Sequence, residues 1–599
     1  MRVLDASVGC ASSPSKAYFH RTMGLCTHRQ REGKGKVYFL IYFFSSSPLI
    51  SSHQPSVLII MHTALALPDI LLHIGDHILE KDLASCVRVC RAWHASLCCF
   101  LFRSVVLSIH NKSQTTTPLF ALKALQRNIR SLQFRFSYPI QFLKLQDCCR
   151  LTHLRIDTSP SCLHFYDNDS ANMPRAFLRG LIPEMNYTTE DPPKHVFSDL
   201  SALVTHHAAT LTCLTLTCDL DLNTASFWRA VGTSPHLVRV ELFLVMIHSP
   251  TLMAFLNACA NVKYLTMFHT TLNIDGPMPE IESIMPTFRR LEELNWQPVF
   301  GQFEERLLVM LEHMPMLKSL AWGKEGLRRG NESLVQRIHH ILATGKVPFL
   351  RELYLPDQSW TDGQLSELVG KMRQLEGLSV QGTRFGPSTF TMLRETGFMQ
   401  SLRKIGLRKC FDVSSRMVQR IMETCVHLED LDAERIESND ILQGEPWVCL
   451  GLRIIKLDFV INEVFTEGQI MKDRELVSNN LRPIQLLLLT RLAELTRLEY
   501  IMFTYSEPEM PREYMMDLRC DRGLQLLGTW TRLKHFGVEE LQRMRAVEIE
   551  WMLKTWPQLE EVSGNLHTNP TKNLDLFKIL AKRGISEKHL VVQTKRYSF

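Results

Sequence analysis

Apolar residues return at regular intervals along most of this chain, in a six-residue pattern with leucine or a similar residue at positions one, four and six. Three examples are residues 151–156, 211–216 and 237–242. From Leu211 to Leu452, successive patterns begin 24 to 33 residues apart. A sustained period of this length is typical of a repeat protein. We call each six-residue pattern a kernel and predict that it forms a strand.

The kernels continue almost to the end of the chain and are separated by segments with helical spacing of apolar residues. Helices are predicted, for example, over 304–314, 333–342, 364–372 and 415–425. Each repeat is therefore predicted to contain a strand, a turn, a helix and a segment that leads back to the next strand. The predicted kernels begin at Ile129, Leu151, Leu211, Leu237, Val262, Leu291, Leu317, Leu350, Leu375, Leu402, Leu428, Leu452, Leu498, Leu533 and Leu559.

This pattern resembles the leucine-rich repeat, in the longer form whose convex side is helical. The resemblance implies an α/β solenoid over residues 106–566, with parallel strands on the concave side and helices on the convex side. A single unit cannot bury both of its apolar faces, so stacked neighbours form one continuous core. Polar stretches near 157–197 and 460–490 are expected to be loops inserted into the solenoid, and residues 567–599 a C-terminal cap or tail.

A different pattern precedes the repeats, because residues 67–102 predict three short helices. Leu67 and Pro68 open the first, in which Ile70 and Ile74 lie one turn apart. A second is predicted from Asp82 through Trp93, and a third carries the apolar residues at 97 and 100–102. Three helices of this size cannot bury all of these apolar faces against one another, so we expect another surface to cover them.

In order and spacing, Leu67-Pro68, Asp82-Leu83 and the run from Val89 to Trp93 resemble the F-box. Asp69 departs from the family, which usually has Glu there, and Phe102 stands near where a Trp often closes the motif. The resemblance implies a helical module over 61–105 that binds a Skp-type adaptor and, through it, cullin and RING subunits. The residues implied in docking are Leu67, Pro68, Ile70, Leu71, Ile74, Leu83, Val89, Cys90 and Trp93.

Two alternatives remain open at this point. Trp93 has two equally supported roles, one in contacting the adaptor and one in holding the three helices together. The helices as a whole have a second interpretation as a simple N-terminal cap of the repeat core.

Composition and charge argue against two classes of partner, nucleic acids and membranes, and indicate where the protein is found. The net charge is +6 over 599 residues and is spread along the chain, which argues against nucleic acid as the main partner. The longest apolar run before the helices, residues 37–44, is far too short to span a bilayer, so no membrane association is expected. Sixteen cysteines without a CxxC pair favour free thiols and a cytoplasmic or nuclear location. Residues 1–60 are expected to be a poorly ordered extension.

The sequence offers no convincing catalytic or metal-binding set. His339 and His340 lack a cysteine or an acid at metal-ligand spacing. The glycines at 323, 326 and 330 are not followed by the Gly-Lys-Ser/Thr of a phosphate-binding loop. We therefore expect no catalytic residue, no metal and no cofactor.

Together, the two patterns predict a substrate-recognition adaptor of a cullin-RING ubiquitin ligase of the SCF type, with a protein substrate bound by the repeats. The alternative is a repeat scaffold without ligase association. In a strand, alternate residues face the same side, so kernel residues between the leucines should line the concave face. These are His153, Arg155, Arg239, Glu241, Tyr264, Glu293, Asn295, Glu352, Tyr354, Lys404, Arg408, Asp430, Asp432, Lys456 and Tyr500.

Overall fold

The computed structural model divides the chain into two compact units, with the division between Leu132 and Gln133. The expected extension 1–60 and almost all of the expected loop at 157–197 lie outside the described residues. The described residues are 67–75, 78, 80–101, 103–109, 129–136, 151–157, 195–217, 224–268, 270–273, 285–297, 309–323, 332–355, 360–461, 474–504, 516–539 and 542–588.

The first unit contains the three helices expected near the start of the chain, α2 (Pro68–Gly75), α3 (Glu80–Cys86) and α4 (Arg91–Leu101). Their facing sides form a small core of Leu71, Leu83, Val87, Trp93 and Leu97. Helices α2 and α4 pack very closely, since a Cβ atom at Gly75 would lie 2.6 Å from the ring of Phe100. Trp93 is therefore a core residue of this unit, one of the two roles left open by the sequence.

Two predictions for this unit are wrong in detail. The apolar spacing from Leu83 to Trp93 does not lie on one helix, because α3 ends at Cys86 and α4 begins at Arg91. Helix α3 also begins at Glu80, two residues before the predicted start at Asp82. The unit also extends past residue 105 to include β1 (Ser104–Ile109), because the N–H groups of Arg130 and Ser131 both bond to the carbonyl of Arg103.

In the second unit, each predicted kernel from Leu151 onward produces a strand that begins two residues after the kernel start. Neighbouring strands pair in parallel and in register. The predicted kernel at Ile129 likewise produces β2 (Ser131–Phe136), which spans the division between the units. The strands are β3 (His153–Asp157), β4 (Cys213–Thr217), β5 (Arg239–Phe243), β7 (Tyr264–Phe268), β9 (Glu293–Gln297), β10 (Ser319–Trp322), β11 (Glu352–Tyr354), β12 (Gly377–Ser379), β13 (Lys404–Gly406), β14 (Asp430–Glu437), β15 (Ile454–Val460), β16 (Tyr500–Phe503), β17 (His535–Val538), β18 (Glu561–Gly564) and β19 (Ser586–Lys588).

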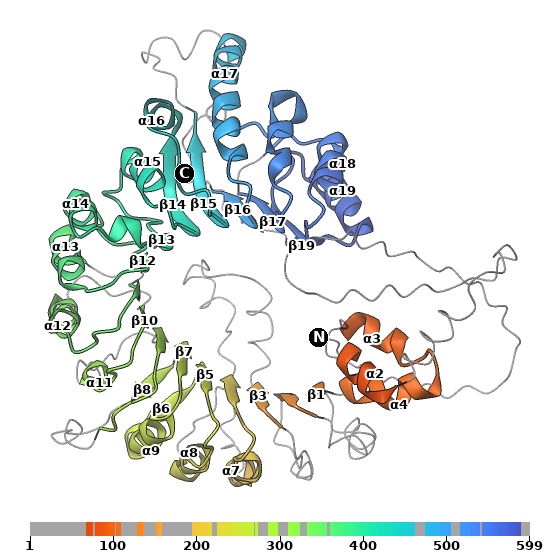
Figure 1. Cartoon of the computed structure of the whole chain (residues 1–599), viewed down its shortest axis with the longest axis vertical. Coiled ribbons are helices and arrows are strands. Elements are labelled where there is room, and N and C mark those ends of the chain that lie inside the picture. The colour runs from red at the N-terminus through yellow and green to blue at the C-terminus, as the bar shows by residue number, and fades with distance from the viewer. Residues whose placement is uncertain are drawn as a thin grey trace, which may run out of the picture. The chain divides into compact units, whose positions relative to one another are not determined.

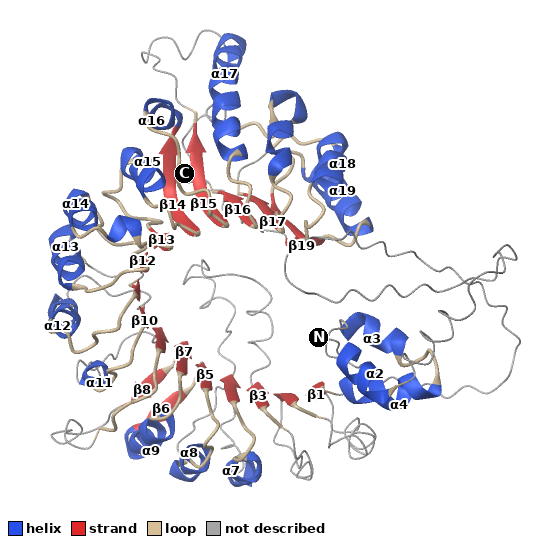
Figure 2. Cartoon of the chain, viewed as in Figure 1, coloured by secondary structure: helices blue, strands red, loops and turns tan. Residues whose placement is uncertain are grey.

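Helices connect these strands and lie on the outer side of the curved second unit, while the strands line its inner side (Figures 1 and 2). This is the architecture of a leucine-rich-repeat solenoid. The helices are α7 (His195–His207), α8 (Ala225–Gly232), α9 (Ser249–Cys259), α11 (Val309–Glu312), α12 (Glu332–Ala343), α13 (Asp362–Lys371), α14 (Pro387–Glu395), α15 (Ser415–Thr424), α16 (Ser438–Gln443), α17 (Arg474–Ala493), α18 (Ala546–Thr555) and α19 (Pro570–Lys582), with short 3-10 helices at Phe398–Gln400, Cys520–Arg522 and Leu524–Thr529.

The core of the solenoid runs between the strands and the helices from one repeat to the next. The middle kernel leucines, such as Leu214, Leu265 and Leu320, are fully or almost fully buried. Where larger residues replace leucine they pack against their neighbours, as do the tilted rings of Trp296 and Trp322, whose centres lie 4.7 Å apart. The core is therefore shared between repeats, as the sequence predicts.

Two features differ from the expected boundaries. The region expected to be an inserted loop at 460–490 contains most of a 20-residue helix, α17, from Arg474 onward. The prediction of a loop there is wrong because a mixture of charges and Pro483 within the helix obscured its helical pattern. At the other end, α19 and β19 continue the array beyond residue 566, since β19 pairs in parallel with β18.

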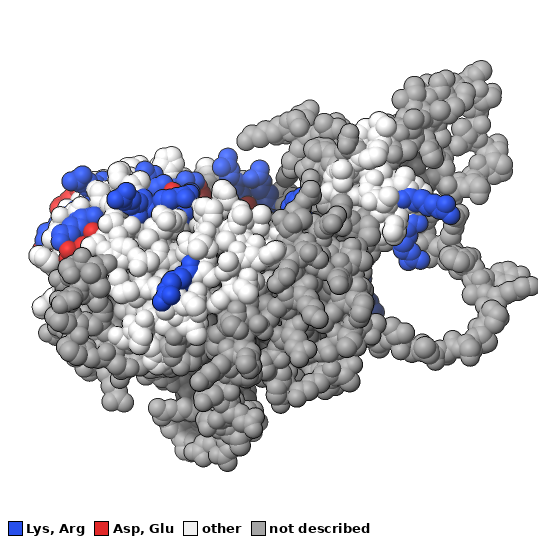
Figure 3. Space-filling model, turned by 90° about the horizontal axis from the view of Figure 1, so that it is seen from below, with Lys and Arg blue, Asp and Glu red and all other residues white. Residues whose placement is uncertain are grey.

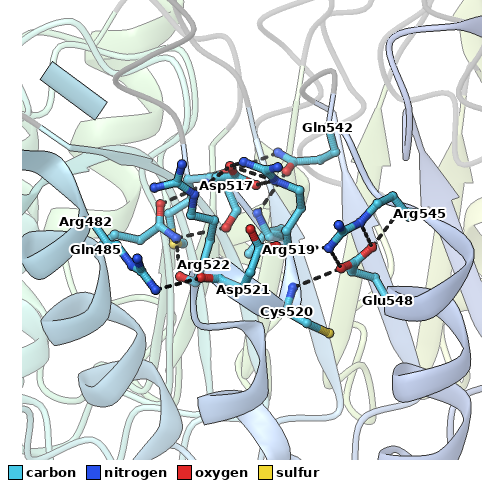
Figure 4. Close-up of polar contacts among 12 residues, drawn as sticks. Arg482, Gln485, Asp517, Arg519, Cys520, Asp521, Arg522, Gln542, Arg545 and Glu548 are labelled. Atoms are coloured by element: carbon cyan, nitrogen blue, oxygen red, sulfur yellow. Dashed lines mark hydrogen bonds and ion pairs between the residues drawn. The ribbon is translucent and has the colours of Figure 1, made fainter. Parts of the chain in front are cut away.

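An irregular segment, residues 516–523, replaces part of a convex helix and depends on buried glutamines for its backbone hydrogen bonds (Figure 4). Gln485 donates to the carbonyls of Asp517, at 2.9 Å, and Arg522, at 2.7 Å, and accepts the N–H of Asp517. Gln542 accepts the N–H of Leu518 at 3.2 Å. These bonds satisfy backbone groups that would otherwise be buried without partners.

Two short strands outside the main sheet, β6 (Met246–His248) and β8 (Thr271–Asn273), pair with each other. Among the described residues, none of the helices has the length and apolar character needed to cross a membrane.

Candidate protein-binding face

Strand register brings the side chains between the kernel leucines into two rows on the concave face. The first row contains the first residue of each strand, and the second row contains the third. Of the predicted residues, the first row holds His153, Arg239, Tyr264, Glu293, Glu352, Lys404, Asp430 and Tyr500, and the second row holds Arg155, Glu241, Asn295, Tyr354, Asp432 and Lys456. Arg408 lies outside both rows, two residues beyond the end of β13.

In the first repeats, this face presents an aromatic ring between two cations. The guanidinium of Arg239 lies 4.6 Å from the centre of the Tyr264 ring, and the Lys263 ammonium lies 5.3 Å from it. Arg239 is also paired with Glu241 at 3.3 Å. Such contacts orient the tyrosine and leave it half-buried, a combination that is frequent at protein interfaces.

Glycines in the middle repeats allow side chains two strands apart to meet. Lys404 on β13 donates to Glu352 on β11 at 3.0 Å, and Gly377 lies between them in register on β12. In the same way, Gln381 donates to Asp432 at 2.9 Å across Gly406. A side chain at either glycine would occupy the path of these contacts, because both glycines have neighbours close to where a Cβ would stand.

Toward the C-terminal end, an ion pair joins Arg408 and Glu539, two residues that are far apart in the sequence. One nitrogen of the Arg408 guanidinium lies 3.1 Å from each carboxylate oxygen of Glu539, so the pair joins the ends of β13 and β17. Burial opposes the charge of Arg408, but Glu539 raises its pKa above the usual value. Burial raises the pKa of Asp432, and nearby Lys456 and Arg408 oppose that rise. Arg408 is thus already engaged within the chain.

The charges of this face are mixed and largely paired with one another, which fits a protein surface better than a polyanion or an apolar ligand. Among the described residues, histidine, cysteine and acidic side chains form no group that could hold a metal ion. The arrangement therefore offers positioned charges and aromatic rings for binding.

The residues predicted to dock the adaptor fall into two classes. Leu71, Ile74, Leu83 and Trp93 are buried within the helical unit, so in this conformation they present little or no surface to a partner. Ile70 is half-buried. Exposed are Leu67 (51% exposed), Pro68, Val89 (48% exposed) and Cys90.

Sequence reasoning missed a third row, at the residue just before each strand. Over eleven consecutive repeats this position is always charged, and the sign alternates at every step except from Lys318 to Arg351. We call this row the edge ladder. It consists of Lys263, Glu292, Lys318, Arg351, Glu376, Arg403, Glu429, Arg453, Glu499, Lys534 and Glu560, and backbone hydrogen bonds connect each member to the next.

Ion pairs join many neighbours in the edge ladder. Glu292 lies 3.1 Å from Lys263 and 3.0 Å from Lys318, and further pairs are Arg351 with Glu376, Arg403 with Glu429, Arg453 with Glu499 and Lys534 with Glu499. Figure 3 shows Lys and Arg interspersed with Asp and Glu along one rim of that view. The second position of each kernel carried this signal, because it alternates between basic and acidic residues along the sequence.

No protein-family model matches this chain, and no curated protein matches it. Among solved structures, the chain is similar to TLR13 in a complex with ssRNA13, at 13% identity and a TM-score of 0.30, over 82% of this chain and 65% of that one. It is also similar to a Bacteroides fragilis protein, at 11% identity and a TM-score of 0.27, over 37% of this chain and 68% of that one. The chain spans just under two thirds of the first structure. Likenesses this weak carry no functional argument, and the fold assignment depends on the strand register and helix placement described above.

Proposed function

We propose that this chain is the substrate-recognition adaptor of an SCF-type cullin-RING ubiquitin ligase. In this proposal the helical unit binds a Skp-type adaptor, and through it cullin and RING subunits, while the concave face of the solenoid binds a protein substrate. The chain contributes proximity and orientation, and other subunits perform the covalent chemistry. Such a protein acts in the cytoplasm or the nucleus, which suits the free thiols of the described cysteines.

The proposal depends on one observation, that the residues of the F-box-like sequence divide into a buried set and an exposed set. Leu71, Leu83 and Trp93 belong to the core of the helical unit, together with Val87 and Leu97. Leu67, Pro68, Val89 and Cys90 stay exposed at positions that the resemblance assigns to docking. Apolar residues left exposed at motif positions favour a partner surface over a simple cap of the repeats.

The test is the double substitution Leu67→Ala with Pro68→Ala in the full chain. Because both residues are exposed, folding should be preserved, while affinity for a purified Skp-type adaptor should fall at least tenfold, as for interface residues that anchor a complex. Leu450, on the solenoid, has the same exposed fraction of 51%, so Leu450→Ala is the matched control and should leave adaptor affinity unchanged. Titration calorimetry measures all three proteins.

The scaffold alternative makes the opposite prediction. If the wild-type chain shows no adaptor binding, or if the double variant binds as tightly as the wild type, the ligase assignment is wrong. The solenoid would then be a protein-interaction module without this connection. Circular dichroism of each variant separates a loss of binding from a loss of folding.

A further inference from the structure

On the strands from β14 to β18, the first row of the concave face has an apolar centre and an acid at each end. Strand register places its members side by side. In order along the solenoid they are Asp430, Ile454, Tyr500, His535 and Glu561, and we call these five residues the C-terminal row. Neighbouring strands lie about 4.8 Å apart, so the row is about 19 Å long.

The centre of the C-terminal row is ordered by contacts among the side chains around it. The ring centres of Tyr500 and His535 lie 5.7 Å apart, and the ammonium of Lys456 lies 5.5 Å from the centre of the Tyr500 ring. At the end of the row, a Glu561 oxygen lies 3.5 Å from Nδ1 of His535. Ile454, Tyr500 and His535 are each half-buried, so part of each side chain is open to a partner. Ordered side chains of this kind make good interface anchors, because little freedom is lost on binding.

Asp430, at the other end of the row, has a carboxylate without a direct partner. Among the described residues this carboxylate accepts no hydrogen bond and forms no ion pair. Lys404, its first-row neighbour on β13, donates to Glu352 at 3.0 Å instead. Burial raises the pKa of Asp430, and Lys456 and Lys404 offset only part of that rise. The carboxylate has therefore lost hydration without gaining a partner, and a cation from another molecule would compensate that loss.

The charges beside the C-terminal row also favour a basic partner. On the same five strands, the second row contributes one acid, Asp432, and one cation, Lys456. The edge ladder, on the other side, contributes three acids and two cations over these repeats. The three rows together hold six acidic and three basic side chains, apart from His535. Complementary charge steers a partner to such a surface and helps to select it.

We propose that the C-terminal row binds a segment of the substrate protein that carries a lysine or arginine next to an apolar side chain. The cation pairs with Asp430, and the apolar side chain packs on Ile454 and Tyr500, the next two members of the row. A length of about 19 Å matches about six residues of extended chain. The inference rests on the proposed binding of a protein substrate by the concave face, and it does not depend on adaptor binding by the helical unit.

Tyr264 supplies a matched control within the same row. It is also half-buried, on β7, but the cations Arg239 and Lys263 lie over its ring. A basic segment that binds at Tyr500 is therefore not expected to bind at Tyr264.

The first experiment selects random phage-displayed peptides on the full wild-type chain and then removes those that bind Tyr500→Ala. The remaining peptides should be enriched in a lysine or arginine beside an apolar residue, and they should bind Tyr264→Ala as tightly as the wild type. If no peptide remains, or if the remaining peptides lack this enrichment, the proposal is overturned. Circular dichroism checks that Tyr500→Ala is folded.

The second experiment measures the affinity of a selected peptide by fluorescence anisotropy, with a variant that removes only charge. Asp430→Asn should weaken binding about threefold at low salt, the scale of a partly exposed ion pair, and less in 1 M NaCl. Glu293→Gln, which changes an exposed acid of the first row on β9, should leave affinity unchanged. Replacing the basic residue of the peptide with alanine should weaken binding to the wild type but not to Asp430→Asn. Equal weakening with both proteins overturns the proposal.

Failure of this site and failure of the ligase assignment give different results. A chain that binds the adaptor but yields no Tyr500-dependent peptide keeps the ligase assignment and loses the site. A chain that binds such peptides but no adaptor loses the ligase assignment and keeps the site. Peptides that depend on Tyr264 in place of Tyr500 would retain binding by the concave face and overturn its assignment to the C-terminal row.

Discussion

One buried carboxylate, that of Glu548, joins separate pieces of backbone near the end of the solenoid (Figure 4). Its side chain is fully buried and accepts the N–H groups of Arg545, at 2.7 Å, and Cys520, at 3.1 Å. The Arg545 guanidinium adds a further bond at 2.8 Å. Burial alone would raise the pKa of Glu548, but these bonds together lower it. The folded state therefore favours the charged form.

We predict that Glu548→Gln lowers the free energy of unfolding by about 2 kcal/mol at neutral pH, the scale of a lost charge-assisted bond. Because the folded pKa is depressed, the carboxylate contributes above its ordinary pKa of 4.5, and that contribution disappears as pH falls through the folded value. Urea unfolding should thus show a larger difference in the free energy of unfolding between the wild type and Glu548→Gln at pH 7 than at pH 3. Exposed Glu550 on the same helix supplies the control, Glu550→Gln.

At the residue scale, the sequence identified apolar positions better than it identified their surroundings. Leu71, Leu83 and Trp93 match the F-box-like pattern as well as Leu67 and Val89 do, yet the first three are core and the last two are exposed. Spacing along a helix gives a face, and only the neighbouring helices decide whether that face is covered. Phe411, whose side chain is 85% exposed on the solenoid, has no feature in the sequence that predicts this exposure.

At the scale of elements, the edge ladder connects repeat to repeat through charge as well as through the core. Glu499 shows the effect most strongly, because Arg453 lies 2.9 Å from its carboxylate and Lys534 lies 3.0 Å from it. Hydrogen bonds from these two cations lower the pKa of Glu499 to about 2. A row of linked ion pairs is worth more than the same number of isolated surface pairs.

We predict that Glu499→Gln reduces the free energy of unfolding by about 1 kcal/mol at low salt and by less in 1 M NaCl, because salt screens exposed charges. The depressed pKa places the contribution of Glu499 above pH 4.5, with loss as pH falls toward 2. Glu560, at the end of the edge ladder, makes no ion pair among the described residues, so Glu560→Gln should have little effect. Equal losses for both variants would contradict a linked ladder.

Strands were the most predictable elements, since each kernel from Leu151 to Leu559 led to a strand in the expected place. The kernel residues are buried by contacts that repeat in every unit, so their pattern survives local variation. Helices on the convex side vary more, and α17 was missed because apolar residues 486–489 run continuously instead of marking one face. The concave rows followed from strand alternation, but the pairing across Gly377 and Gly406 depended on contacts between distant repeats.

At the scale of the whole molecule, the two units differ greatly in the size of their cores. The helical unit depends on a handful of buried residues that include Leu97, whereas the solenoid core extends over all of its described repeats. A small core makes a unit sensitive to a single cavity, because truncating a buried leucine costs about 2–5 kcal/mol.

We therefore predict that Leu97→Ala unfolds the helical unit and abolishes adaptor binding, while the denaturation midpoint of the solenoid stays within 2 °C of the wild type, about the shift expected from less than 1 kcal/mol. Scanning calorimetry of the full chain measures this. In contrast, Leu353→Ala, which truncates a buried residue of β11, should lower the solenoid midpoint and spare adaptor binding. A single transition that shifts equally in both variants would show that the units unfold together.

The regular spacing of the kernels made the solenoid predictable from sequence, because every repeat buries apolar residues at the same kernel positions. The end of the array was placed too early, at 566, since β19 lacks a recognisable kernel and pairs with β18 through its backbone. The polar network around residues 516–523 was also invisible to sequence, because Gln485 and Gln542 become partners of that segment only after folding.

The alternating signs of the edge ladder restrict how such an array changes length in evolution. Loss of one repeat, for example the one that contributes Arg403, would place Glu376 beside Glu429, and duplication of that repeat would place two arginines side by side. Gain or loss of two adjacent repeats preserves the alternation. Within the edge ladder, a change of one repeat therefore creates a like-charged contact that a change of two repeats avoids, and the step from Lys318 to Arg351 is the place where the ladder already carries such a contact.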